Sequence, residues 1–128
     1  MGLFDFLSKK QDVRYFDEGH NLYKHGRYSE AIASFDKVTA LTPDNADAWF
    51  IRGGALDKLG RNGEAVDSFD RVIALTPDNA HAWILRGILL KKLGRDADAV
   101  ASFDRAIAID PDNPDGTILR DSVLKKQT

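Results

Sequence analysis

The chain has 128 residues, the usual size of one domain, with 43% hydrophobic and 30% charged residues. Eighteen basic and twenty acidic side chains leave a formal net charge of -2, so the basic excess that is typical of nucleic-acid-binding domains is absent. The chain has no cysteine, which excludes disulfides, thiolate metal sites and cysteine nucleophiles and agrees with a reducing compartment. We therefore expect a cytoplasmic protein that does not bind nucleic acid.

Residues 1–11 form a short amphipathic segment. Its lysines follow the apolar residues, which reverses the order found in a secretory signal peptide. Helical spacing gathers Leu3, Phe4, Phe6 and Leu7 on one face. We expect this face to dock on the rest of the domain or to fray, and the alternative is contact with a membrane surface or with a second copy of the chain.

An internal repeat organises the rest of the chain. Units 46–79 and 80–113 are identical at 21 of 34 positions, and unit 12–45 follows the same frame more loosely. Three sets of residues recur at this period, which are Pro43, Pro77 and Pro111; Tyr15, Trp49 and Trp83; and Phe35, Phe69 and Phe103. Such a period is the signature of a repeat architecture.

Each unit is predicted to form two antiparallel helices. In the second unit, Trp49 and Leu56 lie on one helical stripe and Phe69 on another, with a turn at Gly60 between them. One pair of helices cannot bury both stripes, so stacked pairs form a solenoid in which Trp49 and Trp83 are expected core residues.

Several recurring residues have expected local roles. A glycine inside a helix, such as Gly53, is explained if a bulky side chain of the paired helix approaches its backbone. Asp78 or Asn79 is expected to cap the helix that follows, and Asn62 and Asp96 to cap the second helices of their units. The acidic and basic neighbours that recur on the second helices are expected to form ion pairs within a repeat, and these neighbours are Asp36-Lys37, Asp70-Arg71 and Asp104-Arg105.

Residues 114–128 look like one more first helix without its partner, followed by a tail. Pro114 suits a first helical position, and one apolar face is formed by Ile118, Leu119, Val123 and Leu124. We expect this segment to cap the third repeat.

The repeat resembles the tetratricopeptide repeat. The matching residues of the second unit are Trp49, Gly53, Leu56, Ala65, Phe69 and Pro77, and those of the third are Trp83, Gly87, Leu90, Ala99, Phe103 and Pro111. The resemblance implies an all-α fold, a right-handed solenoid of antiparallel helix pairs, made of three repeats (12–45, 46–79 and 80–113). It also implies a non-enzymatic module that binds a peptide or helix of a partner protein in a concave groove lined by the first helices.

The resemblance implies that twelve positions of the first helices line the groove. These are Phe16, His20, Tyr23, Lys24, Phe50, Asp57, Lys58, His81, Ile84, Ile88, Lys91 and Lys92. Phe16, Phe50 and Ile84, continued by Ile118, make an apolar stripe, while Lys24, Lys58 and Lys92 make a basic row. An apolar or amphipathic segment flanked by acidic residues would fit them. The alternatives are packing between neighbouring first helices for the stripe and plain solubility for the lysines.

Other functions find little support in the sequence. Family members that bind the acidic C-terminus of large chaperones use a clamp of lysine, asparagine and arginine, but the matching positions here are Phe16, His20, Ile51, His81 and Leu85, so this type of co-chaperone is excluded. His20, His25 and His81 lack the spacing of a zinc site. We expect no enzyme, no metal and no cofactor. The alternative function is a self-assembling scaffold that forms homo-oligomers through the solenoid ends or the segment 1–11.

Overall fold

The computed structural model describes residues 2–126, and this part of the chain contains seven helices and no strand. The helices are α1 (Leu3–Lys24), α2 (Tyr28–Leu41), α3 (Ala46–Lys58), α4 (Asn62–Leu75), α5 (Ala80–Lys92), α6 (Asp96–Ile109) and α7 (Pro114–Lys126). Residues 127–128 of the predicted tail lie outside the described residues.

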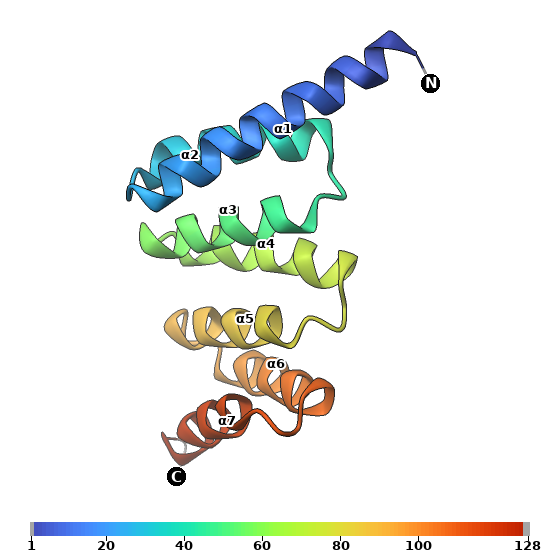
Figure 1. Ribbon diagram of the computed structural model, residues 1–128. Coiled ribbons are helices and arrows are strands. Elements are labelled where there is room, and N and C mark those ends of the chain that lie inside the picture. Colours follow the sequence, from blue (N-terminus) through green and yellow to red (C-terminus); the bar gives the residue numbers. More distant parts are fainter. Residues whose placement is uncertain (1, 127–128) are drawn as a thin grey trace.

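The helices form a stack of antiparallel pairs, as Figure 1 shows. α1 pairs with α2, α3 with α4 and α5 with α6, and each second helix also contacts the first helix of the next pair. α7 packs on α6 in the place of one more first helix. The predicted all-α solenoid of three helix pairs and a capping helix is confirmed.

Three glycines make the turns inside the pairs. Gly26, Gly60 and Gly94 have φ values of 75°, 73° and 77°, in the left-handed region that other residues rarely adopt. Each follows the C-cap residue of a first helix, which confirms the turn predicted at Gly60.

The core is built around one phenylalanine in each second helix. Phe35, Phe69 and Phe103 are at most 1% exposed. A Cβ atom added to Gly53 would lie 2.9 Å from Cε2 of Phe69, too close for two carbon atoms. The prediction that a bulky side chain approaches the helical glycine is therefore confirmed, since the ring occupies the space that any side chain at Gly53 would need.

The two tryptophans lie at the edge of this core, so the prediction of Trp49 and Trp83 as core residues is wrong. Both are half-buried. The indole N–H of Trp49 donates to the carbonyl oxygen of Pro43 at 2.8 Å, and the guanidinium groups of Arg52 and Arg71 lie over the ring. The indole therefore holds the loop between repeats, and its position at the edge of the core lets its N–H reach the Pro43 carbonyl.

The predicted N-caps are correct for the first helices of the repeats and wrong for the second helices. The side chain of Asn79 accepts a hydrogen bond from the Ala82 amide at 3.1 Å, as expected of an N-cap. The prediction for Asn62 and Asp96 is wrong, because they are the first residues of their helices and arginines precede them. Arg61 there forms an ion pair with Glu64 at 2.6 Å, and no side chain caps the start of α4.

A charged contact joins neighbouring helix pairs, which corrects the expected ion pairs within a repeat. Arg52 of α3 donates to Asp36 of α2 at 2.7 Å and to the buried hydroxyl of Ser68 in α4 at 2.7 Å. The same contact recurs one repeat later, from Arg86 to Asp70 and Ser102. The aspartates thus bind the arginine of the next repeat because that side chain crosses the junction.

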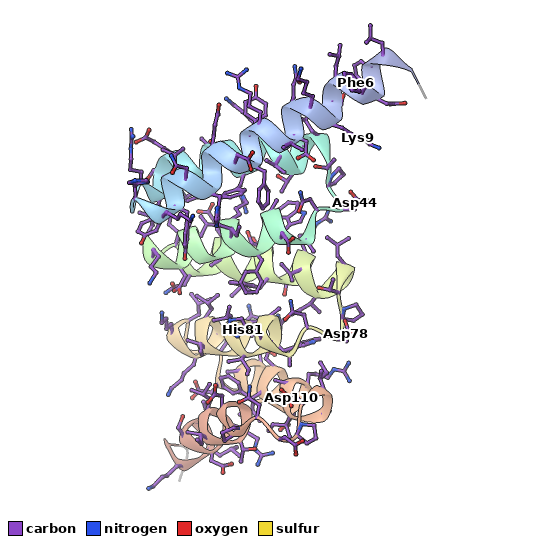
Figure 2. The ribbon with its side chains drawn as sticks, in the orientation of Figure 1. Phe6, Lys9, Asp44, Asp78, His81 and Asp110 are labelled. Atoms are coloured by element: carbon purple, nitrogen blue, oxygen red, sulfur yellow. The ribbon has the colours of Figure 1, made fainter. Side chains whose placement is uncertain are left out.

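Residues 3–11 continue α1 without a break. In Figure 1 the first turns of this helix extend past α2 and α3, and Figure 2 places Phe6 and Lys9 on the extending part. The apolar side chains there are exposed, so the expectation that they dock on the domain is wrong. Within the described residues, no helix is both long and apolar enough to cross a membrane.

Candidate peptide-binding groove

The candidate groove residues occupy equivalent positions of α1, α3 and α5. Because these helices recur with the period of the sequence repeat in one stack, side chains with this spacing share one side of the first helices. We call this side the first-helix face. The rings and charges on it decide whether it can receive a peptide.

Phe16 of α1 lies on the first-helix face and packs against the core. Its ring meets the edge of Phe35 at 5.5 Å between centroids, with an angle of 83° between the planes. His20 is exposed one turn further along α1 and lies nearly parallel to Phe16 at 6.4 Å. Phe16 therefore has a packing role on one side and a partly open side towards solvent.

Phe50 connects two repeats. It meets Phe69 edge-on at 5.4 Å, and its face stacks on the exposed ring of His81 in α5 at 5.6 Å and 29°. Edge-on and stacked contacts of this kind stabilise aromatic pairs beyond the area they bury. The ring is thus held in a fixed position on the face while remaining half-exposed.

A hollow of about 160 Å³ lies between α1 and α3. It is lined by His20, Tyr23, Phe50, Ile51 and Gly54. Tyr23 packs edge-on against Tyr28 at 5.4 Å, and its hydroxyl oxygen lies 3.2 Å from where a Cβ on Gly54 would be. Because position 54 is a glycine, no side chain fills the hollow there, and the rings of His20, Tyr23 and Phe50 surround it.

The second half of the face is aliphatic. Ile84 is only 6% exposed, so the predicted apolar stripe is interrupted there, and packing between helices accounts for this residue. A larger hollow of about 540 Å³ follows between α5 and α7. Its lining residues are Ile88, Lys91, Lys92, Gly94, Asp96 and Val123.

The predicted basic row divides into free and engaged lysines. Lys24 and Lys58 are exposed and form no ion pair within residues 2–126. Lys92 is bound to Asp57 at 3.0 Å, which joins α5 to α3, and Lys91 donates to the hydroxyl of Ser122 at 3.4 Å. Two of the predicted groove lysines therefore hold the repeats together and two face solvent.

Acidic residues gather at the opposite margin, beside the middle of α1 and the start of α3. A hollow of about 260 Å³ there is lined by Asp12, Val13, Phe16, Asp17, Asn45 and Asp47. One carboxylate oxygen of Asp12 is buried without a hydrogen-bond partner. In the described part of the chain, no three His, Asp or Glu side chains are placed to hold a metal ion.

Sequence reasoning missed several of the residues that line the hollows. Val123 belongs to the capping helix, and the repeat period relates it to the buried Leu89, which is the signal that could have found it. Gly94 and Asp96 belong to a turn between helices, and no pattern along the chain indicates that this turn borders the face.

Known structures share this fold. The second tetratricopeptide domain of human RPAP3, in complex with the HSP70 peptide SGPTIEEVD, is 23% identical, with 91% of this chain and 97% of that chain covered and a TM-score of 0.83. The Yersinia enterocolitica type III secretion chaperone SycD, in complex with a YopD peptide, is 15% identical, with 91% and 94% covered and a TM-score of 0.83. MamA from Desulfovibrio magneticus RS-1 is 22% identical, with 91% and 66% covered and a TM-score of 0.84.

The sequence itself gives the family. No curated protein matches the chain significantly. The family model of the tetratricopeptide repeat matches residues 16–80 and 55–114, which together span the three helix pairs almost completely. With the helix pairs, turn glycines and buried phenylalanines described above, this chain belongs to the tetratricopeptide repeat family.

Proposed function

We propose that the chain is a protein-interaction module whose first-helix face binds an amphipathic segment of a partner protein. The observation that carries the proposal is the hollow between α1 and α3, where Tyr23, Phe50 and His20 are held in place around an open glycine. A preformed hollow lined by aromatic side chains binds an apolar anchor without the cost of ordering its own walls.

The charges on either side of the hollow favour one kind of segment. Lys24 and Lys58 lie at the ends of α1 and α3, whereas Asp12 lies in the middle of α1 and Asp47 at the start of α3. A bound segment that crosses the first helices would therefore place acidic side chains beside the lysines and basic or polar ones at the other margin. Such complementarity fixes the direction of the segment more than it adds affinity.

The structural relatives support a peptide as the ligand. The RPAP3 domain and SycD hold peptides on folds that match this chain along nine-tenths of its length. The positions that would clamp a terminal carboxylate are here occupied by apolar or histidine side chains, such as Phe16, Ile51 and Leu85. We therefore propose an internal amphipathic segment as the ligand, and the proposal assigns the chain no catalytic step.

A displayed library of short amphipathic peptides tests the proposal. The full chain is expected to enrich peptides that combine two or three large apolar residues with acidic flanks. Fluorescence anisotropy of the enriched peptides should give dissociation constants near about 1 μM, which corresponds to about 8 kcal/mol of binding free energy. Affinity should fall as salt is raised, because Lys24 and Lys58 are exposed charges.

Variants of exposed groove residues separate binding from folding. His20→Ala and the pair Lys24→Gln with Lys58→Gln should each weaken the enriched peptides at least threefold, and neither removes a buried group. Lys37→Gln, an exposed lysine of α2, is the matched control. Equal affinity of all these variants for every enriched peptide would contradict the proposal. Self-assembly through the solenoid ends stays a prediction, which sedimentation velocity of the full chain tests.

A further inference from the structure

The first turns of α1 carry an apolar surface that no other described element covers. Leu3, Phe4, Phe6 and Leu7 are 72%, 80%, 62% and 46% exposed, and we call these four side chains the apolar tip. The tip lies on the part of α1 that extends past the helix pairs in Figure 1. Four large apolar side chains so close together are an unusual surface for a helix in water.

The tip differs from the rest of the outer side of α1. Helical geometry places Leu3 and Leu7 about 120–160° around the helix from Gly19, which faces Phe35 of the core. Further along that outer side, α1 is polar, and Arg14 and Glu18 form an exposed ion pair at 3.2 Å. Beyond the tip, Val13 is the one large apolar side chain in the described part of α1 that is mainly exposed, at 59%, so the apolar surface is concentrated at the tip and offers no continuous face for stacking a further helix pair.

Two lysines follow the tip directly. Lys9 and Lys10 are exposed and have no ion-pair partner within the described residues, while Asp5 is the one acidic side chain in residues 1–11. A rise of about 1.5 Å per residue puts Lys9 about 9 Å along the helix from Leu3. This part of the chain is thus basic in a protein whose formal net charge is -2.

The size and charge of the tip favour a lipid surface over a second copy of the chain. A stable protein interface takes about 20–30 residues from each side, and the tip offers four apolar side chains. A membrane surface needs no matching partner, because apolar side chains enter the boundary between headgroups and acyl chains to a depth of about 5–10 Å. If α1 enters by its first turn with Leu3 at this depth, Lys9 lies about 9 Å further along the helix axis, at the level of the headgroup phosphates.

We propose that the apolar tip of α1 anchors this protein to an anionic membrane surface. Phenylalanine and leucine side chains enter the interface, and Lys9 and Lys10 bind the phosphate groups of acidic lipids. The solenoid then stands clear of the membrane with its first-helix face accessible. This inference does not depend on the proposed peptide ligand, since the tip and the groove share no residue.

Flotation of the full chain with lipid vesicles tests the anchor. Vesicles of phosphatidylcholine mixed with phosphatidylserine should carry the protein at least tenfold more efficiently than vesicles of phosphatidylcholine alone. Phe4→Ser with Phe6→Ser should reduce the bound fraction at least tenfold, and Lys9→Gln with Lys10→Gln should remove the preference for phosphatidylserine. Because all four side chains are exposed, the circular dichroism spectrum and the melting temperature should not change.

A matched control uses apolar residues of the helix turns. Leu59→Ser with Leu93→Ser changes two side chains that are 40% and 42% exposed and lie far from the tip, and it should leave flotation unchanged. Failure of the wild-type chain to float with either vesicle would overturn the proposal, as would equal loss in the tip and control variants. Sedimentation velocity gives a further test. If the wild-type chain is a homo-oligomer and Phe4→Ser with Phe6→Ser makes it a monomer, the tip binds a second copy of the chain, and this outcome would also overturn the membrane proposal.

Discussion

The two sides of each first helix differ in how strictly they repeat. On the side that faces the preceding helix pair, Arg52 and Arg86 make the same contacts with an aspartate and a buried serine at nearly the same distances. On the first-helix face, equivalent positions change chemistry, and the series His20, Gly54 and Ile88 is an example. The junction side is uniform and the open side is varied.

The difference follows from what each side must satisfy. Each junction joins a second helix to the next first helix in similar geometry, so an arginine and an aspartate recur there, and Arg120 binds Asp104 at the junction of α6 with α7. α1 has no preceding helix pair in the structure, and there Glu18 replaces the arginine and binds Arg14 within its own helix. The open side is less constrained by packing, and its variation places different chemistry at successive points of the face.

The largest effect is expected from a core ring that supports both sides. Phe69→Ala should lower the free energy of unfolding by about 3–5 kcal/mol, because it leaves a cavity against Gly53 and removes the support of Phe50. Urea denaturation measures it. A loss below about 1 kcal/mol would show that the core of this repeat collapses around the cavity. It would also contradict the role of Phe69 in supporting both Gly53 and Phe50.

A glycine pair tests the close approach of the ring directly. Gly53→Ala should destabilise the fold by about 1–3 kcal/mol, because the new methyl group would overlap with Phe69. Gly63→Ala is the matched control in α4, where nothing lies within 4 Å, and it should stabilise the helix by up to about 1 kcal/mol. The difference in melting temperature between the two variants is the measurement, and equal values would contradict the packing described for Gly53.

The next largest effect on the free energy of unfolding is expected from the arginine contact between neighbouring helix pairs. Arg52→Ala removes the partner of the buried Ser68 hydroxyl and of Asp36, so the free energy of unfolding should fall by about 1–3 kcal/mol. Arg61→Ala serves as the control, since its exposed ion pair with Glu64 lies within one turn at the start of α4, and a loss below about 0.5 kcal/mol is expected. Similar losses in both variants would mean that the junction does not depend on the bridging arginine.

The smallest effect concerns one exposed ion pair. The hydrogen bond from Arg61 lowers the pKa of Glu64 below its ordinary value, so the charged form is favoured in the folded state. A lowered pKa stabilises the fold above the ordinary pKa near 4.5, and this contribution disappears as the pH falls through the folded value. Carboxyl carbon NMR of Glu64 measures the titration, and Arg61→Gln should return it to the ordinary range. An unchanged titration in that variant would assign the shift to another cause.

Much of the fold was predictable because it depends on local, repeated features. The turn at Gly60, a cap at Asp78 or Asn79 and a bulky side chain against Gly53 each follow from backbone conformation or from the period of the repeat; the turn and the bulky side chain are confirmed, and of the two cap candidates Asn79 is the one that caps. The candidate site was less predictable. The period places residues on the first-helix face, but whether Ile84 is open or buried depends on how closely two helix pairs approach.

Two of the wrong predictions share one physical cause. The partner of Asp36 and the edge position of Trp49 both depend on long side chains that reach from one element to another. Neighbours along the chain do not show which element such a side chain will reach. The exposed course of α1 before residue 12 has another cause, because a sequence pattern does not show where the covering helix α2 ends.

The sequence by itself determined the repeat, its helix pairs, their turns and the phenylalanine core, since glycine, proline and apolar periodicity act within a few residues of one another. The tertiary structure decided which lysines are free, where the hollows open and which apolar side chains remain exposed. These properties depend on the distance between stacked helices, and that distance is set by the packing of whole repeats.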